Sequence, residues 1–395
     1  MHQSFLRALV VAIAGLMLAL PAVGEPFRPG QDSQVLERLP TGLSQDPQLR
    51  DLRQLRDRLT QDPDNLELAL EIARSYISLA RAEGDPRYQG YAQAALAPWW
   101  QEPQAPAEVL MLRATIRQNG HDFEAALQDL ERLLRARPHD SQAWLTRAVI
   151  LQVQGRFAEA YESCWPLQRS NRLLATACLA GAAGSSGHAA SSYDMLQRAL
   201  AKSPHAAYED QLWALTSLAD LALRLGRHEA AEAHFEAALA LEVRDIYLLS
   251  AYADFLLDRD RPQEVLDLLA DEVRSDALLL RLTLAESRLG SAMLGQHVTL
   301  LADRFAQSRR RGDTLHLGAE SRFLLHLRGA PAEALQLARQ NWRLQREPVD
   351  ARRVLEAALA ARDRAGAQTV IAWLDETRLE DVRLAELAHQ IQELS

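Results

Sequence analysis

The side chains that could do covalent chemistry are two cysteines, Cys164 and Cys178. In an oxidising compartment they could form a disulfide, whose loop of roughly 15 residues would stabilise the fold by on the order of 3 kcal/mol in the chain-entropy picture. The alternative is two buried thiols that pack as small apolar side chains. No CxxC motif is present, which argues against a catalytic dithiol. We favour the disulfide because the start of the chain, described below, predicts export.

A second candidate for chemistry is His316, with Glu320 one helical turn later and His326 further along the chain. Histidine and glutamate bind metals, but a lone pair of them on an amphipathic helix is usually solvent-facing polarity. The stretch GAAGSSG (181–187) lacks the lysine of a phosphate-binding loop, and no GxSxG, HExxH or dinucleotide-binding motif occurs. The sequence therefore predicts no metal site, no cofactor and no enzymatic activity.

Short paired helices must position these residues. The segment SQAWLTRAVILQVQGRFAEAYESCWPL (141–167) places apolar residues on one helical face before Gly155 and on another after it. Ala126 and Ala160, from two copies of this phrase, lie 34 residues apart, as do Ala231 and Val265. The pattern and the period resemble the tetratricopeptide repeat. The alternative is a generic bundle of alanine-rich helices.

One such hairpin cannot bury its own apolar face, so neighbouring hairpins must stack. We therefore expect an all-α fold, a superhelical α-α solenoid of stacked hairpins in which small residues such as Ala160 lie where helices approach closely. The expected divisions are a signal peptide (1–24), a flexible lead-in (25–45), N-terminal capping helices (46–104), the repeat array (105–345) and a C-terminal hairpin with a capping helix (346–395).

The first residues predict export. One arginine precedes an uncharged apolar run from Ala8 to Leu20, and Ala22-Val23-Gly24 then forms a small-x-small cleavage site. The run of 13 residues is shorter than the roughly 20 that cross a bilayer. We expect a mature chain that begins at Glu25, is periplasmic or secreted, and has no stable membrane insertion. The formal net charge of −9 argues against a nucleic-acid partner.

The concave groove of such a stack, lined mainly by the first helix of each hairpin, is the expected binding surface. Trp213 and Tyr247 lie 34 residues apart on first helices, as do Asp220 and Asp254. This acidic, aromatic stripe would prefer an extended segment that carries Arg or Lys. The alternative is that both aromatic side chains pack between hairpins. The expected groove residues are Gln142, Gln152, Trp213, Asp220, Arg224, Tyr247, Asp254, Asp258, His316, Phe323 and His326.

Three longer segments, at 80–100, 245–265 and 337–361, resemble a group of exported bacterial tetratricopeptide proteins without an assigned activity. The resemblance implies the fold and export, and it brings no catalytic residue, cofactor or partner. The sequence thus predicts a periplasmic, non-enzymatic scaffold for a protein or peptide partner in the cell envelope. The alternatives are an accessory subunit of an envelope enzyme or transport assembly and, less favoured, a small-molecule or metal binder at His316.

Overall fold

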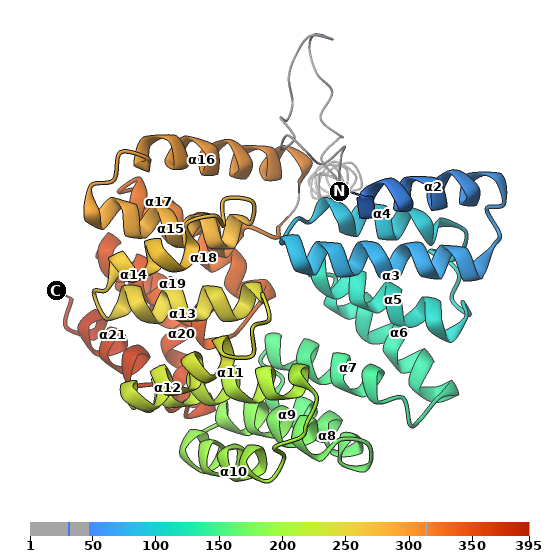
Figure 1. Ribbon diagram of the computed structural model, residues 1–395. Helices are drawn as coiled ribbons and strands as arrows, with labels where there is room; N and C mark the ends of the chain where they lie inside the picture. Colours follow the sequence, from blue (N-terminus) through green and yellow to red (C-terminus); the bar gives the residue numbers. More distant parts are fainter. Residues whose placement is uncertain (1–30, 32–46, 313, 395) are drawn as a thin grey trace, which may run out of the picture.

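The protein is a stack of helical hairpins, seen in a computed structural model that describes residues 31, 47–312 and 314–394 (Figure 1). The described part contains twenty α-helices, two 3-10 helices and no β-strand, which confirms the all-α prediction. The predicted signal peptide (1–24) lies outside the described residues, as does the lead-in (25–45) apart from residue 31. Of the helices that the structure describes, none has the length and apolar character needed to cross a membrane.

The helices follow one another along the chain, and most pair with the next one into a hairpin. Their bounds are α2 (Pro47–Gln61), α3 (Leu66–Glu83), α4 (Arg87–Ala95), η1 (Ala97–Trp99), α5 (Ala107–Asn119), α6 (Phe123–Ala136), α7 (Ser141–Val153), α8 (Phe157–Cys164), η2 (Trp165–Arg169), α9 (Arg172–Gly184), α10 (Ala189–Ala201), α11 (Tyr208–Arg224), α12 (His228–Leu239), α13 (Ile246–Asp258), α14 (Pro262–Leu269), α15 (Asp276–Leu289), α16 (Leu294–Arg311), α17 (Leu317–Leu327), α18 (Pro331–Leu344), α19 (Pro348–Ala361), α20 (Arg364–Thr377) and α21 (Val382–Gln392).

Local signals in the sequence explain where these helices begin. Asn65, Asp140, Asn171 and Asp245 precede α3, α7, α9 and α13, and each side chain accepts a hydrogen bond from the backbone N–H three residues ahead. Such a cap satisfies a donor that the first helical turn leaves unpaired. Between α7 and α8 the chain reverses at Gly155, whose φ of 74° suits a residue without a Cβ.

Alanine occupies the contacts between helices. Ala126, Ala160 and Ala231 come from three different hairpins and are each 0% exposed. Phe123 and Phe157, three residues before the first two of these alanines, are also buried. A small side chain lets two helices approach, and the aromatic ring fills the space beside it. The predicted role of these positions is therefore confirmed.

The stack bends into an arc, and its N-terminal hairpin α3–α4 returns to loops far along the chain (Figure 1). The contacts lie between the end of α3 and the α12–α13 and α14–α15 loops. We call them the N-terminal closure: Arg81 with Asp245 at 3.4 Å, Arg274 with Glu83 at 3.3 Å, and Arg244 with the carbonyl of Ala82.

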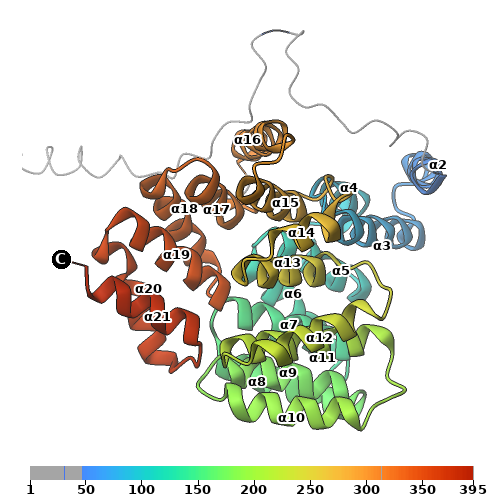
Figure 2. The same ribbon diagram turned by 60° about the vertical axis from the view of Figure 1, so that its left-hand side comes forward.

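The C-terminal helices α19, α20 and α21 stand as a layer beside the middle hairpins (Figure 2). The backbone N–H of Arg346, in the loop before α19, donates to the carbonyl of Val153 at the end of α7 at 2.7 Å. Trp373 of α20 packs on Phe157 of α8, with ring centroids 6.2 Å apart. We call these helices the C-terminal layer, and its contacts run to hairpins that are distant in sequence.

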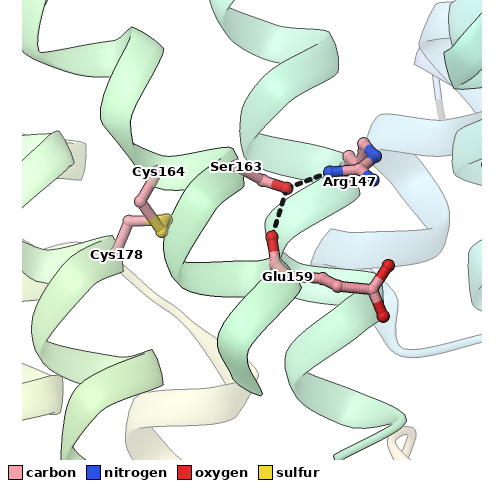
Figure 3. The surroundings of a disulfide bond; sticks show 5 residues. All are labelled: Arg147, Glu159, Ser163, Cys164 and Cys178. Carbon is pink, nitrogen blue, oxygen red and sulfur yellow. Dashed lines mark hydrogen bonds between the residues drawn. A yellow bond between two sulfur atoms is a disulfide. The ribbon is translucent and has the colours of Figure 1, made fainter. Parts of the chain in front are cut away.

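The predicted disulfide between Cys164 and Cys178 is present, with Cα atoms 5.6 Å apart (Figure 3). It joins the end of α8 to α9, and both sulfur-bearing residues are fully buried. Next to it, the Ser163 hydroxyl donates to the carbonyl of Glu159 at 2.7 Å and accepts from Arg147 of α7 (Figure 3). Three consecutive helices are therefore connected at one place.

Candidate binding interior

The first helices of the N-terminal hairpins, α3, α5 and α7, form a hollow of about 420 Å³ together with Gln89 of α4. Its polar side chains are carboxamides and hydroxyls, and Arg81 is the one charged residue among the lining residues. We call this hollow the amide groove; it is lined by Ile77, Ala80, Arg81, Gln89, Thr115, Gln118, Asn119, Gln142, Leu145, Thr146 and Val149. The predicted groove residue Gln142 belongs to it.

The amide groove has unused hydrogen-bonding capacity. The Oε1 atom of Gln89 is buried and has no hydrogen-bond partner among the described residues. The amide nitrogen of Gln142 makes one long contact, 3.4 Å, to the hydroxyl of Thr146. Each carboxamide offers two N–H donors and an acceptor oxygen. A buried polar atom without a partner costs free energy, so a ligand that supplies donors and acceptors would be stabilised here.

A second part of the interior gathers around Tyr247, at the start of α13. Its side chain is 63% exposed to solvent. Burial nevertheless raises the pKa of its hydroxyl, the charges of Asp220 and Glu347 raise it further, and Arg224 opposes them. We call Asp220, Arg224, Tyr247 and Glu347 the inner cluster.

Glu347 brings the C-terminal layer into the inner cluster. It precedes α19, and its side chain and that of Asp350 form a capping box with each other's backbone N–H groups. Burial raises the pKa of the Glu347 carboxyl to about 7, with help from Asp350 and Asp220 and against the charge of Arg353. Two carboxylates close to a buried third disfavour its ionisation. The inner cluster therefore has a surplus of negative charge, which a cationic group would relieve.

The other predicted aspartates have arginine partners. Asp254 lies 2.6 Å from Arg281 and 2.5 Å from Arg322. Burial alone would raise the pKa of Asp254, but these two arginines outweigh it and hold the pKa well below its usual range. Asp258 accepts two hydrogen bonds from Arg352, at 2.5 and 2.7 Å. The acidic stripe expected from the 34-residue spacing is thus neutralised along α13 by the chain itself.

Trp213 and Tyr247 lie in different surroundings. Trp213 is partly buried and packs against two clusters of the core, around α9–α11 and around the disulfide. Arg224 is buried, lies 3.1 Å from Asp220 and donates to the carbonyl of Gly184 at 3.3 Å. Gln152 lies against Gly181, where an added Cβ would come within 2.6 Å of its Oε1. Tyr247 is therefore the exposed aromatic side chain of the predicted stripe.

Of the predicted residues near the end of the array, His316 and Phe323 both pack on Phe305, whereas His326 lies apart, near Glu356. Phe323 is buried in the core, and the His316 ring lies 6.0 Å from that of Phe305. His316 is 3.9 Å from Asp276, whereas His326 is 3.7 Å from Glu356 on α19. In the part of the chain that the structure describes, no group of three or more His, Cys, Asp and Glu side chains could hold a metal ion.

Sequence reasoning missed three kinds of interior residue. The repeat spacing does not predict that Arg281 and Arg322 neutralise Asp254, nor that Glu347 joins the inner cluster. Gln118 and Asn119, the last two residues of α5, also line the amide groove, at positions for which the repeat pattern specifies no residue type. The run of carboxamides at the ends of first helices was a readable signal for the amide groove.

Comparison with known families agrees with this architecture. Residues 214–242 match the family model described as a tetratricopeptide repeat. They cover most of α11, the turn at Gly226 and α12. The chain carries a tetratricopeptide repeat. The other hairpins stack with this one as a solenoid.

Similarity to solved structures is distant. A tetratricopeptide repeat protein from Parabacteroides merdae matches at 16% identity and a TM-score of 0.44, over 66% of this chain and 93% of that one. The complex Cut9-Hcn1 matches at 11% identity and 0.47, over 84% and 64%. Yeast Tom70 matches at 12% identity and 0.30, over 87% and 96%. No curated protein matches the sequence.

Proposed function

We propose that this tetratricopeptide-repeat protein is an exported, non-enzymatic scaffold that holds an extended segment of a partner protein inside its arc. The observation that carries the proposal is the amide groove, where a buried Gln89 oxygen lacks a partner and the exposed amide of Gln142 makes one long contact, to Thr146. An extended peptide presents N–H and C=O groups alternately, and carboxamides can pair with both. Peptide recognition in helical-repeat proteins uses such concave surfaces.

The lining of the amide groove also suits a side chain of the bound segment. Ile77, Leu145 and Val149 supply apolar surface between the polar groups. Burying an apolar side chain there gains on the order of 25 cal/mol for each Å² removed from water. The groove therefore offers hydrogen bonds to the backbone and an apolar contact to a side chain.

The inner cluster gives the segment a charge preference. Asp254 and Asp258 pair with arginines, and Asp220 lies 3.1 Å from Arg224, so the attraction for a basic residue falls chiefly on Glu347, beside the exposed ring of Tyr247. A Lys or Arg of the partner would lie near the Glu347 carboxyl and could stack on the tyrosine ring. The sequence predicts that a basic residue of the partner binds along the whole acidic, aromatic stripe, whereas this arrangement restricts its binding to the end at Tyr247.

The test is capture of the partner from an extract of the cell envelope with wild type, Gln142→Ala, Tyr247→Ala and, as control, Trp165→Ala. Tyr247→Ala should weaken binding by about 2 kcal/mol, roughly thirtyfold, as expected for a central aromatic contact. Trp165→Ala removes an exposed aromatic side chain outside the interior and should bind normally. Equal capture by all four proteins would contradict the proposal. A stable stoichiometric complex with an enzyme or transporter would identify an accessory subunit instead.

Export has its own test. The intact mass of the protein from its native host should correspond to a chain that begins at Glu25. A protein that retains Met1 to Gly24 and sediments with membranes would contradict export while leaving the scaffold proposal open to the capture experiment.

A further inference from the structure

A second hollow, of about 650 Å³, lies at Trp165 and shares no residue with the amide groove or the inner cluster. All seven tryptophans belong to the described part of the chain, and Trp165, 53% exposed, is the one that is exposed. We call this the Trp165 hollow; it is lined by Pro138, His139, Ser141, Glu162, Trp165, Pro166, Arg169 and Ser170. Its volume is in the range of small-molecule sites.

Trp165 is held in place from both sides. The preceding residue, Cys164, is bonded to Cys178, and after Pro166 the next residue, Leu167, is fully buried. The ring of Tyr161 meets the indole edge to face, with centroids 6.1 Å apart. A rigidly held aromatic side chain loses little conformational freedom when a ligand binds, so more of the contact energy remains as affinity.

The face of Trp165 is open, unlike those of two other tryptophans. Trp100 and Trp144 each have a guanidinium of this chain over the ring, at 5.5 and 5.8 Å from the centroid. No arginine covers Trp165 in the part of the chain that the structure describes. Its indole face is therefore available to an outside group.

The charges in the Trp165 hollow select the class of ligand. Glu162 and Arg169 are exposed, and neither pairs with another side chain among the described residues. One carboxylate and one guanidinium nearly cancel, so the hollow gives neither an anion nor a cation a net attraction. A neutral ligand with many hydroxyl groups can use both, because a carboxylate accepts two hydrogen bonds and a guanidinium donates several.

We propose that the Trp165 hollow binds a neutral carbohydrate. One face of a pyranose ring consists of C–H groups and can stack on the indole, while the hydroxyls at its rim donate to Glu162 and accept from Arg169. Ser141 and Ser170, whose hydroxyls are 2.8 Å apart, add further acceptors at the wall. The site is separate from the interior, so the protein would hold a polypeptide on one surface and a glycan on another.

The probe is cellotetraose, a neutral, β-1,4-linked glucose tetramer, added to the full chain labelled with ¹⁵N and followed at the indole N–H resonances. One indole resonance should shift saturably, and the same resonance should be missing in Trp165→Ala. Affinity should fall about tenfold or more in Trp165→Ala and about threefold in Glu162→Gln, since stacking carries most of the energy. Tyr208→Ala, which removes another exposed aromatic side chain, should bind as wild type does.

The proposal is overturned if about 20 mM cellotetraose, well above a millimolar dissociation constant, shifts no indole resonance. It is also overturned if the shift persists in Trp165→Ala. A shift caused by hexaproline but not by the sugar would identify the hollow as a docking site for a proline-rich segment instead. Thermal melts of each variant ensure that a loss of binding is not a loss of folding. Capture of the protein partner does not enter this test, so the two proposals fail independently.

Discussion

The carboxylate of Asp254 on α13 lies 2.5 Å from the guanidinium of Arg322 on α17, two hairpins further along the chain. Arg281, on the intervening α15, approaches the same carboxylate at 2.6 Å. One acidic side chain therefore holds together the first helices of three successive hairpins. Because all three groups are largely buried, removing the carboxylate would leave two arginines without compensation.

Asp254→Asn should lower the free energy of unfolding by about 2 kcal/mol at pH 7, less than the loss for a fully buried pair because the site is partly exposed. Because folding depresses the pKa of Asp254, its carboxylate stabilises the folded protein fully at pH values above the unfolded-state pKa of about 4. This stabilisation is lost as the pH falls towards the pKa of the folded state. Urea denaturation at pH 7 and pH 3 should show the difference between wild type and variant shrinking at pH 3. Asp271→Asn, at an exposed aspartate, is the control. A constant difference would contradict the ion-pair account.

Glu347→Gln should have the opposite pH dependence. The Glu347 pKa of about 7 lies above the unfolded value near 4.3, so the contribution of this carboxyl is fully present at low pH and lost as the pH rises through 7. The glutamine keeps an acceptor for the cap of α19 and has no charge to bury. The variant should therefore be no more stable than wild type near pH 4. Its free energy of unfolding should then exceed that of wild type by an amount that grows between about pH 4.5 and 7 to about 2 kcal/mol and levels off above pH 7. Denaturation curves across this pH range test the prediction, with Glu333→Gln as the exposed control. A difference in free energy of unfolding between Glu347→Gln and wild type that does not change with pH would contradict it.

Trp213→Ala and Tyr247→Ala should separate stability from binding. Trp213 packs against two core clusters, so its truncation should cost about 2 kcal/mol or more of stability. Tyr247 is mostly solvent-exposed, so its truncation should leave the melting temperature within about 2 °C of wild type. Differential scanning calorimetry of both variants gives the comparison. An equal loss of stability in the two would mean that Tyr247 also belongs to the core.

Ala160→Trp should overpack a position that is 0% exposed and cost about 1 to 3 kcal/mol or more. The repeat pattern alone predicts that the local unfolding stays within residues 105–204. The structure predicts that it also reaches the C-terminal layer, because Phe157 of the same helix packs on Trp373. Hydrogen exchange should therefore rise in α20 as well as in α7 to α9. The exposed neighbour Ala158→Trp is the control, and unchanged exchange in α20 would refute the coupling.

Much of the fold could be read from the sequence because it depends on local rules. The 34-residue spacing of Ala126 and Ala160 reports a helix contact that each hairpin repeats, and burial at both positions agrees with it. The cysteine pair could be read in the same way, since consecutive helices of a solenoid must be neighbours. These inferences required only the period and the chemistry of single residues.

The interior could not be read in the same way. Equal spacing places Trp213 and Tyr247 at equivalent positions of consecutive helices, but exposure depends on what faces them from elsewhere in the arc. For Tyr247 that includes Glu347, and for Asp254 it includes Arg322. Such partners are set by the curvature of the whole stack, which is a sum of small rotations between hairpins that no single repeat encodes.

The backbone bond from Arg346 to Val153 and the ion pairs of the N-terminal closure change how this chain should fold. A linear repeat array folds and unravels hairpin by hairpin, because each unit contacts only its neighbours. Here the early and late hairpins complete one another, so part of the entropy of closing very long loops must be lost before those contacts form. We therefore expect one cooperative unfolding transition and slow refolding, and removal of either end should weaken the opposite side of the arc as well as the adjacent hairpin.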